Sequence, residues 1–314
     1  MPILELVVGL VLLLAGGDAL VRGAVALATR LSVPPLVIGL TLVGFGTSTP
    51  ELVASLAAAL RDAPGVAVGN IVGSNIANIL LILGVGALIL PLAVPRGTLR
   101  RDGAVLIGAT LVMTAIVLTG SLARWAGAVL VLSLAAYTAF AFRSGLREGA
   151  SGDEVVTWPR SAGTGLALAV GGIAGVVVGA DLLVDAAIQF AAIAGVSEAV
   201  IGLTVVAVGT SLPELATAVV AALRRQADVA LGNVIGSNIF NILGIAGVTA
   251  LVVPIDVPPE IARFDVWVML VAALALVALA AASRGIGRLV GAALLTAYVV
   301  YIAVLVGPAL SAGG

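Results

Sequence analysis

Two short polar stretches interrupt long apolar segments of the chain, and each stretch carries one carboxylate. Residues 44–51 read GFGTSTPE and residues 209–214 read GTSLPE. An ionisable residue inside an apolar segment of this kind normally marks an ion path. Glu51 and Glu214 therefore predict cation chemistry, because neither has a basic residue nearby in the sequence that could neutralise it.

A proline directly precedes each carboxylate and makes further oxygen atoms available. Proline has no N–H, and its ring crowds the carbonyl four residues earlier. Pro50 is expected to free the carbonyl of Gly46 and to loosen Thr47, and Pro213 to do the same around Thr210. Free carbonyls are costly in lipid unless they face a cavity or a cation. Each stretch thus offers hydroxyls, carbonyls and a carboxylate within about one helical turn.

The segment after each stretch supplies amides and more hydroxyls. Ser74 and Asn78 are four residues apart and share a helix face, and Ser237 and Asn241 repeat the arrangement. We expect these four side chains to face the two carboxylates. The other asparagines of these segments are expected to make hydrogen bonds between helices: Asn70, Asn75, Asn233 and Asn238.

Oxygen is the only ligand type on offer, which limits the ion. The chain contains no His and no Cys, so thiol chemistry and His or Cys metal sites are excluded, and no cofactor is expected. Oxygen ligands select hard cations. Ca²⁺ takes about six to eight oxygens and accepts bidentate carboxylates, whereas Mg²⁺ retains its waters. Two glutamates balance one divalent charge, so Ca²⁺ fits best, with Na⁺ or H⁺ as other possible occupants.

The composition places this chemistry in a membrane. Of 314 residues, 61% are hydrophobic and only 10% are charged, against about a quarter charged in soluble domains. The net charge of −1 gives no sign of a nucleic-acid partner. The first residues, MPILELVVGLVLLLAGG, lack a basic n-region and a cleavage site, so we interpret them as a retained membrane helix.

Apolar runs bounded by charges and prolines predict an all-α membrane protein with ten transmembrane helices. The expected spans are 3–29, 35–60, 66–90, 103–120, 125–142, 160–194, 199–223, 229–253, 265–282 and 288–307. With the N-terminus outside, eleven arginines fall in inner loops and three in outer loops. This bias predicts that both termini are extracellular.

The two halves of the chain are copies. Residues 36–80 and 199–243 are identical at 27 of 45 positions without a gap, at a constant offset of 163. Five helices per copy is an odd number, so the second copy must be inverted, as in many secondary transporters. We expect repeats at 1–142 and 160–314. The linker at 143–159 is too short for a large regulatory domain.

Four charged residues of the first and sixth spans stand apart from the polar stretches. Asp18 and Arg22 are four residues apart and are expected to neutralise each other. The counterparts of Asp18 and Arg22 are Asp181 and Asp185, so an alternative is that Arg22 pairs with Asp185.

The paired motifs GTSTPE with GNIVGSNIANI, and GTSLPE with GNVIGSNIFNI, resemble the two alpha-repeats of the cation/calcium antiporter superfamily, in its sodium/calcium exchanger branch. The resemblance covers both repeats and a chain length typical of prokaryotic members. It implies a multi-pass protein of a prokaryotic cell membrane, whose first and sixth helices slide over a static core. Position 241 is Asp in some members, including potassium-dependent exchangers; Asn241 argues against K⁺ co-transport.

The resemblance also implies a set of ion ligands. The matching side chains are Thr47, Ser48, Glu51, Ser74, Asn78, Thr210, Ser211, Glu214, Ser237 and Asn241, with backbone carbonyls at Gly44 and Ala207. The expected activity is exchange of Ca²⁺ for Na⁺ by alternating access. Exchange against H⁺ and a passive cation channel are the alternatives. An intramembrane enzyme is disfavoured because no His, Cys or G-x-S-x-G motif is present. The expected partners are inorganic cations and the lipid bilayer.

Overall fold

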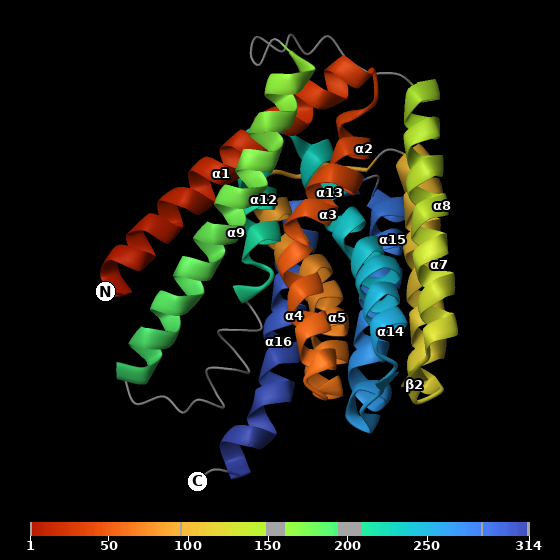
Figure 1. Cartoon of the computed structure of the whole chain (residues 1–314). Helices are drawn as coiled ribbons and strands as arrows, with labels where there is room; N and C mark the ends of the chain where they lie inside the picture. The colour runs from red at the N-terminus through yellow and green to blue at the C-terminus, as the bar shows by residue number, and fades with distance from the viewer. Residues whose placement is uncertain (1, 95, 149–160, 194–208, 284, 313–314) are drawn as a thin grey trace.

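The computed structural model describes residues 2–94, 96–148, 161–193, 209–283 and 285–312. Its described part is almost entirely helical (Figure 1). The elements of the first half are α1 (Pro2–Leu31), α2 (Pro35–Ile38), η1 (Gly39–Val43), α3 (Gly44–Thr47), α4 (Thr49–Leu60), α5 (Pro64–Ala77), η2 (Asn78–Ile82), α6 (Leu83–Ile89), β1 (Leu92–Ala93), α7 (Arg96–Leu118), β2 (Ser121–Leu122) and α8 (Arg124–Glu148).

The second half repeats these elements at nearly the same spacing. They are α9 (Ala162–Ile193), α12 (Leu212–Leu223), α13 (Ala227–Phe240), η4 (Asn241–Ala246), α14 (Gly247–Val252), β3 (Ile255–Asp256), η5 (Ile261–Asp265), α15 (Val266–Ser283), β4 (Gly285–Ile286) and α16 (Arg288–Ala312). The bounds of α4 and α12, and of α5 and α13, differ by the offset of the sequence repeat.

Eight helices of the described residues are long and apolar enough to cross a membrane. A ninth span results if Pro35–Thr47 and Thr49–Leu60, which meet at a bend of 43°, form one broken helix. The expected span 199–223 lies partly outside the described residues, and only the short helix α12 is seen there. The first six residues of the expected linker belong to α8, which ends at Glu148.

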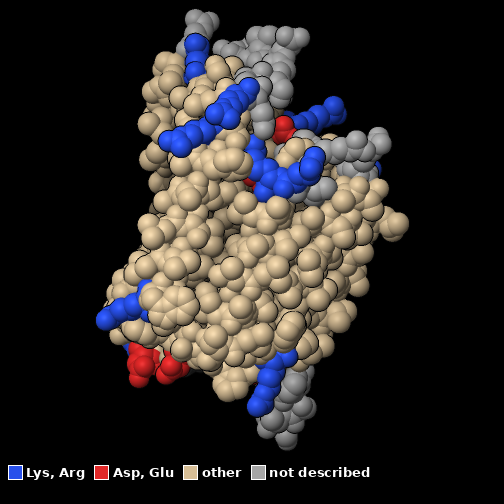
Figure 2. All heavy atoms as spheres, turned by 90° about the vertical axis from the view of Figure 1, so that its right-hand side faces the viewer, with Lys and Arg blue, Asp and Glu red and all other residues tan. Residues whose placement is uncertain are grey.

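The surface agrees with a membrane location. In Figure 2 the charged side chains gather at the two ends of the molecule and leave a broad uncharged band between them. Large apolar side chains such as Leu132, Val271 and Val299 are exposed within the spanning helices. An uncharged belt of this kind matches the hydrocarbon layer.

Four two-residue strands correct the all-α expectation. Strand β1 pairs antiparallel with β4, and β2 with β3, so each pairing joins one half of the chain to the other. Because the β1–β4 and β2–β3 pairs link the ends of long helices, they leave the helical architecture unchanged.

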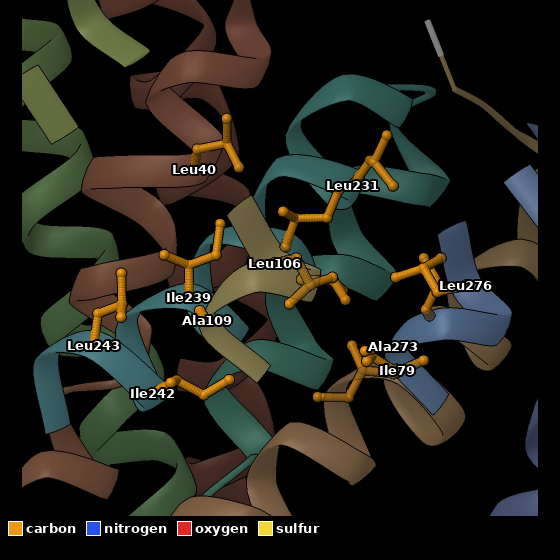
Figure 3. Packing of buried hydrophobic residues seen from close by; sticks show 14 of the residues in the cluster. Leu40, Ile79, Leu106, Ala109, Leu231, Ile239, Ile242, Leu243, Ala273 and Leu276 are labelled. Carbon is orange, nitrogen blue, oxygen red and sulfur yellow. The ribbon is translucent and has the colours of Figure 1, made fainter. Parts of the chain in front are cut away.

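Apolar side chains from both halves pack into one core. Figure 3 shows Leu40 of η1, Leu106 of α7 and Leu276 of α15 packing with Leu231 of α13 and Ile242 of η4. All five are nearly inaccessible to solvent. The core therefore holds α13 and the broken helix α2–α4 in fixed positions, and these two elements carry most of the polar motifs.

Hydrogen bonds between a tyrosine and an aspartate join neighbouring outer helices in each half. Asp102 at the start of α7 is fully buried, pairs with Arg101 at 3.0 Å and accepts a hydrogen bond from Tyr137 of α8 at 3.1 Å. In the second half Tyr301 of α16 donates to Asp265 at 2.9 Å. Burying a charge costs free energy unless the group is paired and hydrogen-bonded, and the contacts of Asp102 meet both conditions.

Candidate cation-binding site

Both carboxylates lie in the first turn of a helix that starts at a break in the chain. Ser48 and Ser211 have non-helical backbone angles, and α4 and α12 begin at the next residue with proline near the start. Proline suits this position because the N–H it lacks would be unpaired anyway. Glu51 and Glu214 follow directly and are each 1% exposed. The positive end of each helix dipole favours a negative charge there.

The serine at each break donates to the carboxylate of the other half. Ser48 Oγ donates to Glu214 Oε1 at 2.7 Å, and Ser211 Oγ donates to Glu51 Oε1 at 3.4 Å. The two breaks therefore meet across the duplicated halves, and the two carboxylates share one buried region.

Two asparagines hold the breaks in place from the neighbouring helices. Asn233 Nδ2 donates to the Glu214 carbonyl at 3.2 Å, and its Oδ1 accepts from Thr47 at 3.2 Å. Asn70 makes the equivalent bonds, to the Glu51 carbonyl at 3.1 Å and from Thr210 at 3.4 Å. Each asparagine thus joins the glutamate of its own half to the threonine of the other, which confirms the expectation of interhelical bonding for this pair.

The other two asparagines behave differently from expectation. Asn75 and Asn238 each donate to the carbonyl four residues earlier in their own helix, at 2.7 Å, and make no bond between helices through that amide group. Their Oδ1 atoms are buried without a partner.

The helix α13 approaches the break very closely. Ser237 Oγ donates to the Gly44 carbonyl at 3.2 Å. A Cβ at Gly44 would lie 3.0 Å from the Ser237 backbone nitrogen, and a Cβ at Gly236 would lie within 2.7 Å of Leu40 backbone atoms. Only glycine permits this approach, which places the Gly44 carbonyl beside the two breaks.

Asn78 and Asn241 occupy equivalent positions at the start of π-helical segments. Each is the first residue of its segment, η2 or η4, and each is 1% exposed. π-Helical turns occur frequently at functional sites, because the wider turn redirects side chains. Ser74 lies one turn earlier on α5 and is also buried.

Among the predicted ligands, four buried acceptor oxygens have no hydrogen-bond partner, two from each half. They are Glu51 Oε2, Asn78 Oδ1, Glu214 Oε2 and Asn241 Oδ1. Buried acceptors are normally satisfied, and each unsatisfied one needs a reason. Within the described chain no three Asp, Glu, His or Cys residues gather, so any ion here needs amide, hydroxyl or carbonyl ligands besides the two carboxylates.

The structure thus brings together most of the predicted ligand set. Eight of the predicted ligands make a hydrogen bond to a residue of the other half: Gly44, Thr47, Ser48, Glu51, Thr210, Ser211, Glu214 and Ser237. Ser74, Asn78 and Asn241 are buried on the adjoining helices. Ala207 lies outside the described residues.

A family model for the sodium/calcium exchanger protein matches residues 1–143 and 164–307, which includes both breaks and both carboxylates. The chain belongs to the sodium/calcium exchanger family. This membership makes it a multi-pass membrane transporter of the cation antiporter type.

Relatives of the exchanger family match over nearly the full chain. The inner membrane protein YrbG of Escherichia coli is 38% identical, with 96% of this chain and 95% of YrbG covered. The sodium/calcium exchanger MaX1 of Methanosarcina acetivorans is 36% identical, with 96% and 97% covered. A structure of the sodium-calcium exchanger NCX_Mj, soaked with Na⁺ and Sr²⁺, superposes with a TM-score of 0.85 at 34% identity, covering 96% and 97%.

Proposed function

We propose that this member of the exchanger family moves Ca²⁺ against Na⁺ across the membrane by alternating access. The proposed architecture is ten membrane helices in two inverted five-helix repeats, 1–142 and 160–314, joined by the linker 143–159. The proposed ion ligands are the twelve residues that the motifs predict, from Gly44 to Asn241, with Glu51 and Glu214 as the charged pair.

The observation that carries this proposal is the four unpartnered oxygens among the predicted ligands. Two are carboxylate oxygens and two are amide oxygens, and all are buried between the halves. No ion pair involving Glu51 or Glu214 occurs among the described residues, so a bound cation is the group that would balance them. One Ca²⁺ cancels both charges, and its preference for about six to eight oxygens matches the number of ligands nearby.

The element directions support inverted repeats. In Figure 1 α4 runs downward from its break, and its counterpart α12 runs upward. The strand pairs also lie at opposite ends, since β1–β4 follows α6 and β2–β3 follows α7. Two copies related in this way present the same ligands to both sides of the membrane, which is the geometric requirement for alternating access.

Sodium as the counter-ion follows from the surplus of neutral oxygens. Hydroxyl and amide groups hold Na⁺ without a formal charge, and serines and asparagines outnumber the carboxylates here. This gives room for about three Na⁺, bound by oxygen as hard cations are. In the relative NCX_Mj, crystals were soaked with Na⁺ and Sr²⁺, a divalent ion with the charge of Ca²⁺.

We further propose the cell membrane of a prokaryote as the location, with both termini outside. The helix ends that carry most arginines, such as the last turns of α1 and α8, lie at the upper end of the molecule (Figure 1). The C-terminal helix α16 ends at the opposite end, whereas α1 begins at about mid-height. Arginine enrichment marks the cytoplasmic side, so the upper end would face the cytoplasm.

The test is uptake of radioactive Ca²⁺ into proteoliposomes under a K⁺/valinomycin voltage clamp. Exchange of about three Na⁺ for one Ca²⁺ moves one net charge, worth about 2.3 kcal/mol per 100 mV. Uptake into Na⁺-loaded vesicles moves that charge outward, so an inside-positive voltage should accelerate it. Choline-loaded vesicles provide the control.

Two outcomes would replace this proposal. Uptake that ignores voltage and Na⁺ but follows a pH gradient would establish exchange against protons, with the same two glutamates titrating. Flux that neither saturates nor increases with Ca²⁺ on the far side would establish a passive channel instead of an antiporter.

A further inference from the structure

Asp18, near the middle of α1, binds two arginines. It pairs with Arg22 of its own helix at 2.9 Å, as the spacing predicts. It also forms an ion pair with Arg224, which directly follows α12. This second contact, which no spacing in the sequence predicts, joins α1 to the helix that carries Glu214 in its first turn.

The sequence repeat maps this contact onto a second pair of residues. An offset of 163 relates Asp18 to Asp181 of α9, and Arg61 at the end of α4 to Arg224. Both positions keep the sign of their charge. Within the described residues, Asp181 and Arg61 form no ion pair, and both are exposed. Helix α1 packs on α12, whereas α9 has no comparable packing on α4.

Helices α1 and α9 form one unit with backbone-to-backbone contact. A Cβ added to Gly16 or Gly23 of α1, or to Gly172 or Gly179 of α9, would lie within 2.7 Å of a backbone atom of the other helix. Contact this close along several turns packs the two helices into one unit. In Figure 1 they lie side by side, and their lower ends diverge from α4 and α5.

We propose that Asp18–Arg224 and Asp181–Arg61 are alternative ion pairs, made in turn as the α1–α9 unit moves over the site. This inference rests on the proposed alternating access of inverted repeats. Inversion requires that the contact of α1 with α12 in one state becomes the contact of α9 with α4 in the other. The structure shows the state with Asp18–Arg224 formed and Asp181–Arg61 open.

The two arginines couple the movement to the site. Helix α4 begins with Glu51 in its first turn and ends just before Arg61, and α12 connects Glu214 to Arg224 in the same way. Each ion pair therefore fixes the α1–α9 unit to the far end of a helix that carries one site carboxylate. An exchange of pairs keeps the number of ion pairs constant, so neither state is strongly favoured.

The neighbouring charges make the two pairs unequal. Arg22 and Arg224 share the single carboxylate of Asp18, whereas Asp181 has a second acid, Asp185, one turn away. Arg61 would thus meet two acids on α9, and Arg224 meets one acid that is already paired. The residues that follow the two arginines also differ. Arg61 is followed by the acidic Asp62, whereas Arg224 is followed by Arg225, whose like charge repels it.

Cross-linking in this Cys-free chain tests the proposal. One variant carries Asp18→Cys with Arg224→Cys, and another carries Asp181→Cys with Arg61→Cys. The mismatched combination of positions 61 and 224, at the ends of α4 and α12, is the control, and its two cysteines also lie in different halves. A protease site inserted in the linker 149–160 separates the halves on a gel unless a short bifunctional thiol reagent has joined them.

Both matched variants are expected to cross-link at least about tenfold faster than the control. With a bifunctional methanethiosulfonate, which joins thiols through disulfides, each cross-link stops transport until it is reduced. Adding Arg224→Gln to the 61/181 variant is expected to raise its cross-linking rate about two- to fivefold, the range for exposed ion pairs. Arg225→Gln is the matched control and leaves the rate unchanged.

A 61/181 rate equal to that of the mismatched 61/224 control would overturn the proposal, as would both cross-links in one molecule of a four-cysteine variant. Cross-linking does not depend on which ion is carried. If both matched pairs cross-link but the protein takes up no Ca²⁺, the proposal that Ca²⁺ is the transported ion would be refuted and the proposed exchange of ion pairs would stand. Na⁺-driven uptake without a 61/181 cross-link would do the reverse.

Discussion

Replacing one site carboxylate by its amide, as in Glu214→Gln, isolates the charge that Ca²⁺ needs. Two unit charges about 4 Å apart interact by about 4 kcal/mol at an effective dielectric constant of 20. A divalent ion doubles this to about 8 kcal/mol. We expect about half to be offset, because the amide oxygen stays as a ligand and the empty site no longer buries two like charges. The remaining 4 kcal/mol is about a thousandfold loss of affinity.

Thermal unfolding of the purified protein measures this loss of Ca²⁺ affinity without requiring a transport assay. Ca²⁺ at about one hundred times its dissociation constant stabilises the wild type by about 2.7 kcal/mol. For a chain of 314 residues this is an upward Tm shift of roughly 4 °C. In Glu214→Gln the same Ca²⁺ concentration contributes about 0.1 kcal/mol, and the shift disappears. Without Ca²⁺ the variant should be at least as stable as the wild type.

The matched control is Glu260→Gln, which makes the same chemical change at an exposed residue before η5. This control should keep the full Ca²⁺-dependent Tm shift. A Glu214→Gln variant that retains the shift would refute the reasoning, because the carboxylate would then lie outside the ion site. Loss of the shift in the control would show that the effect is not local.

Asn241→Asp adds a third negative charge to the site and should alter selectivity among Na⁺, K⁺ and Ca²⁺ in flux assays; an unchanged profile places this residue outside the site. Asn233→Ala removes the bonds to Thr47 and to the Glu214 carbonyl, and should weaken Ca²⁺ binding about tenfold, as expected for one or two buried hydrogen bonds. Tyr137→Phe leaves one carboxylate oxygen at Asp102 with a bond fewer and should cost about 2 kcal/mol in stability without changing Ca²⁺ affinity. Cysteines at Ser151 and at the C-terminus should label from opposite sides of the membrane, and labelling from one side contradicts the proposed topology.

The candidate site is visible in the sequence because its motif occurs in both halves of the chain. A carboxylate, a proline and hydroxyls recur at a fixed offset in a chain with few other polar residues inside its apolar runs. Pro50 and Glu51 alone locate a break and a charge within one turn. The same two residue types recur at Pro213 and Glu214, which indicates that the two breaks and the two carboxylates have one common role.

Contacts between the halves could not be read from the sequence. Ser48 bonds to Glu214 and not to Glu51, and this partner choice depends on how two broken helices cross. The approach of α13 to Gly44 is set by packing across the whole core. The π-helical turns at Asn78 and Asn241 carry no recognisable sequence signal, since their residues also suit an α-helix.

The asparagines show the limit of reasoning from residue type. Asn70 and Asn75 are both buried or partly buried in the same helix, and both are able to bond to a neighbour. Asn70 faces the break of its own half, whereas Asn75 turns its amide back to its own backbone. The difference is one of helix rotation, which the sequence leaves open when every face of a helix is buried.

Displacement of bound Ca²⁺ by Na⁺ tests the central claim most directly, since the account places both ions in one cavity. The measurement is binding of radioactive Ca²⁺ to the purified protein at fixed pH while Na⁺ is increased at constant ionic strength with choline. The account predicts complete displacement with a Hill coefficient clearly above one, because about two or more Na⁺ replace each Ca²⁺ among the oxygen ligands. Ca²⁺ binding that persists at saturating Na⁺, or that falls only when the pH is lowered, would contradict it.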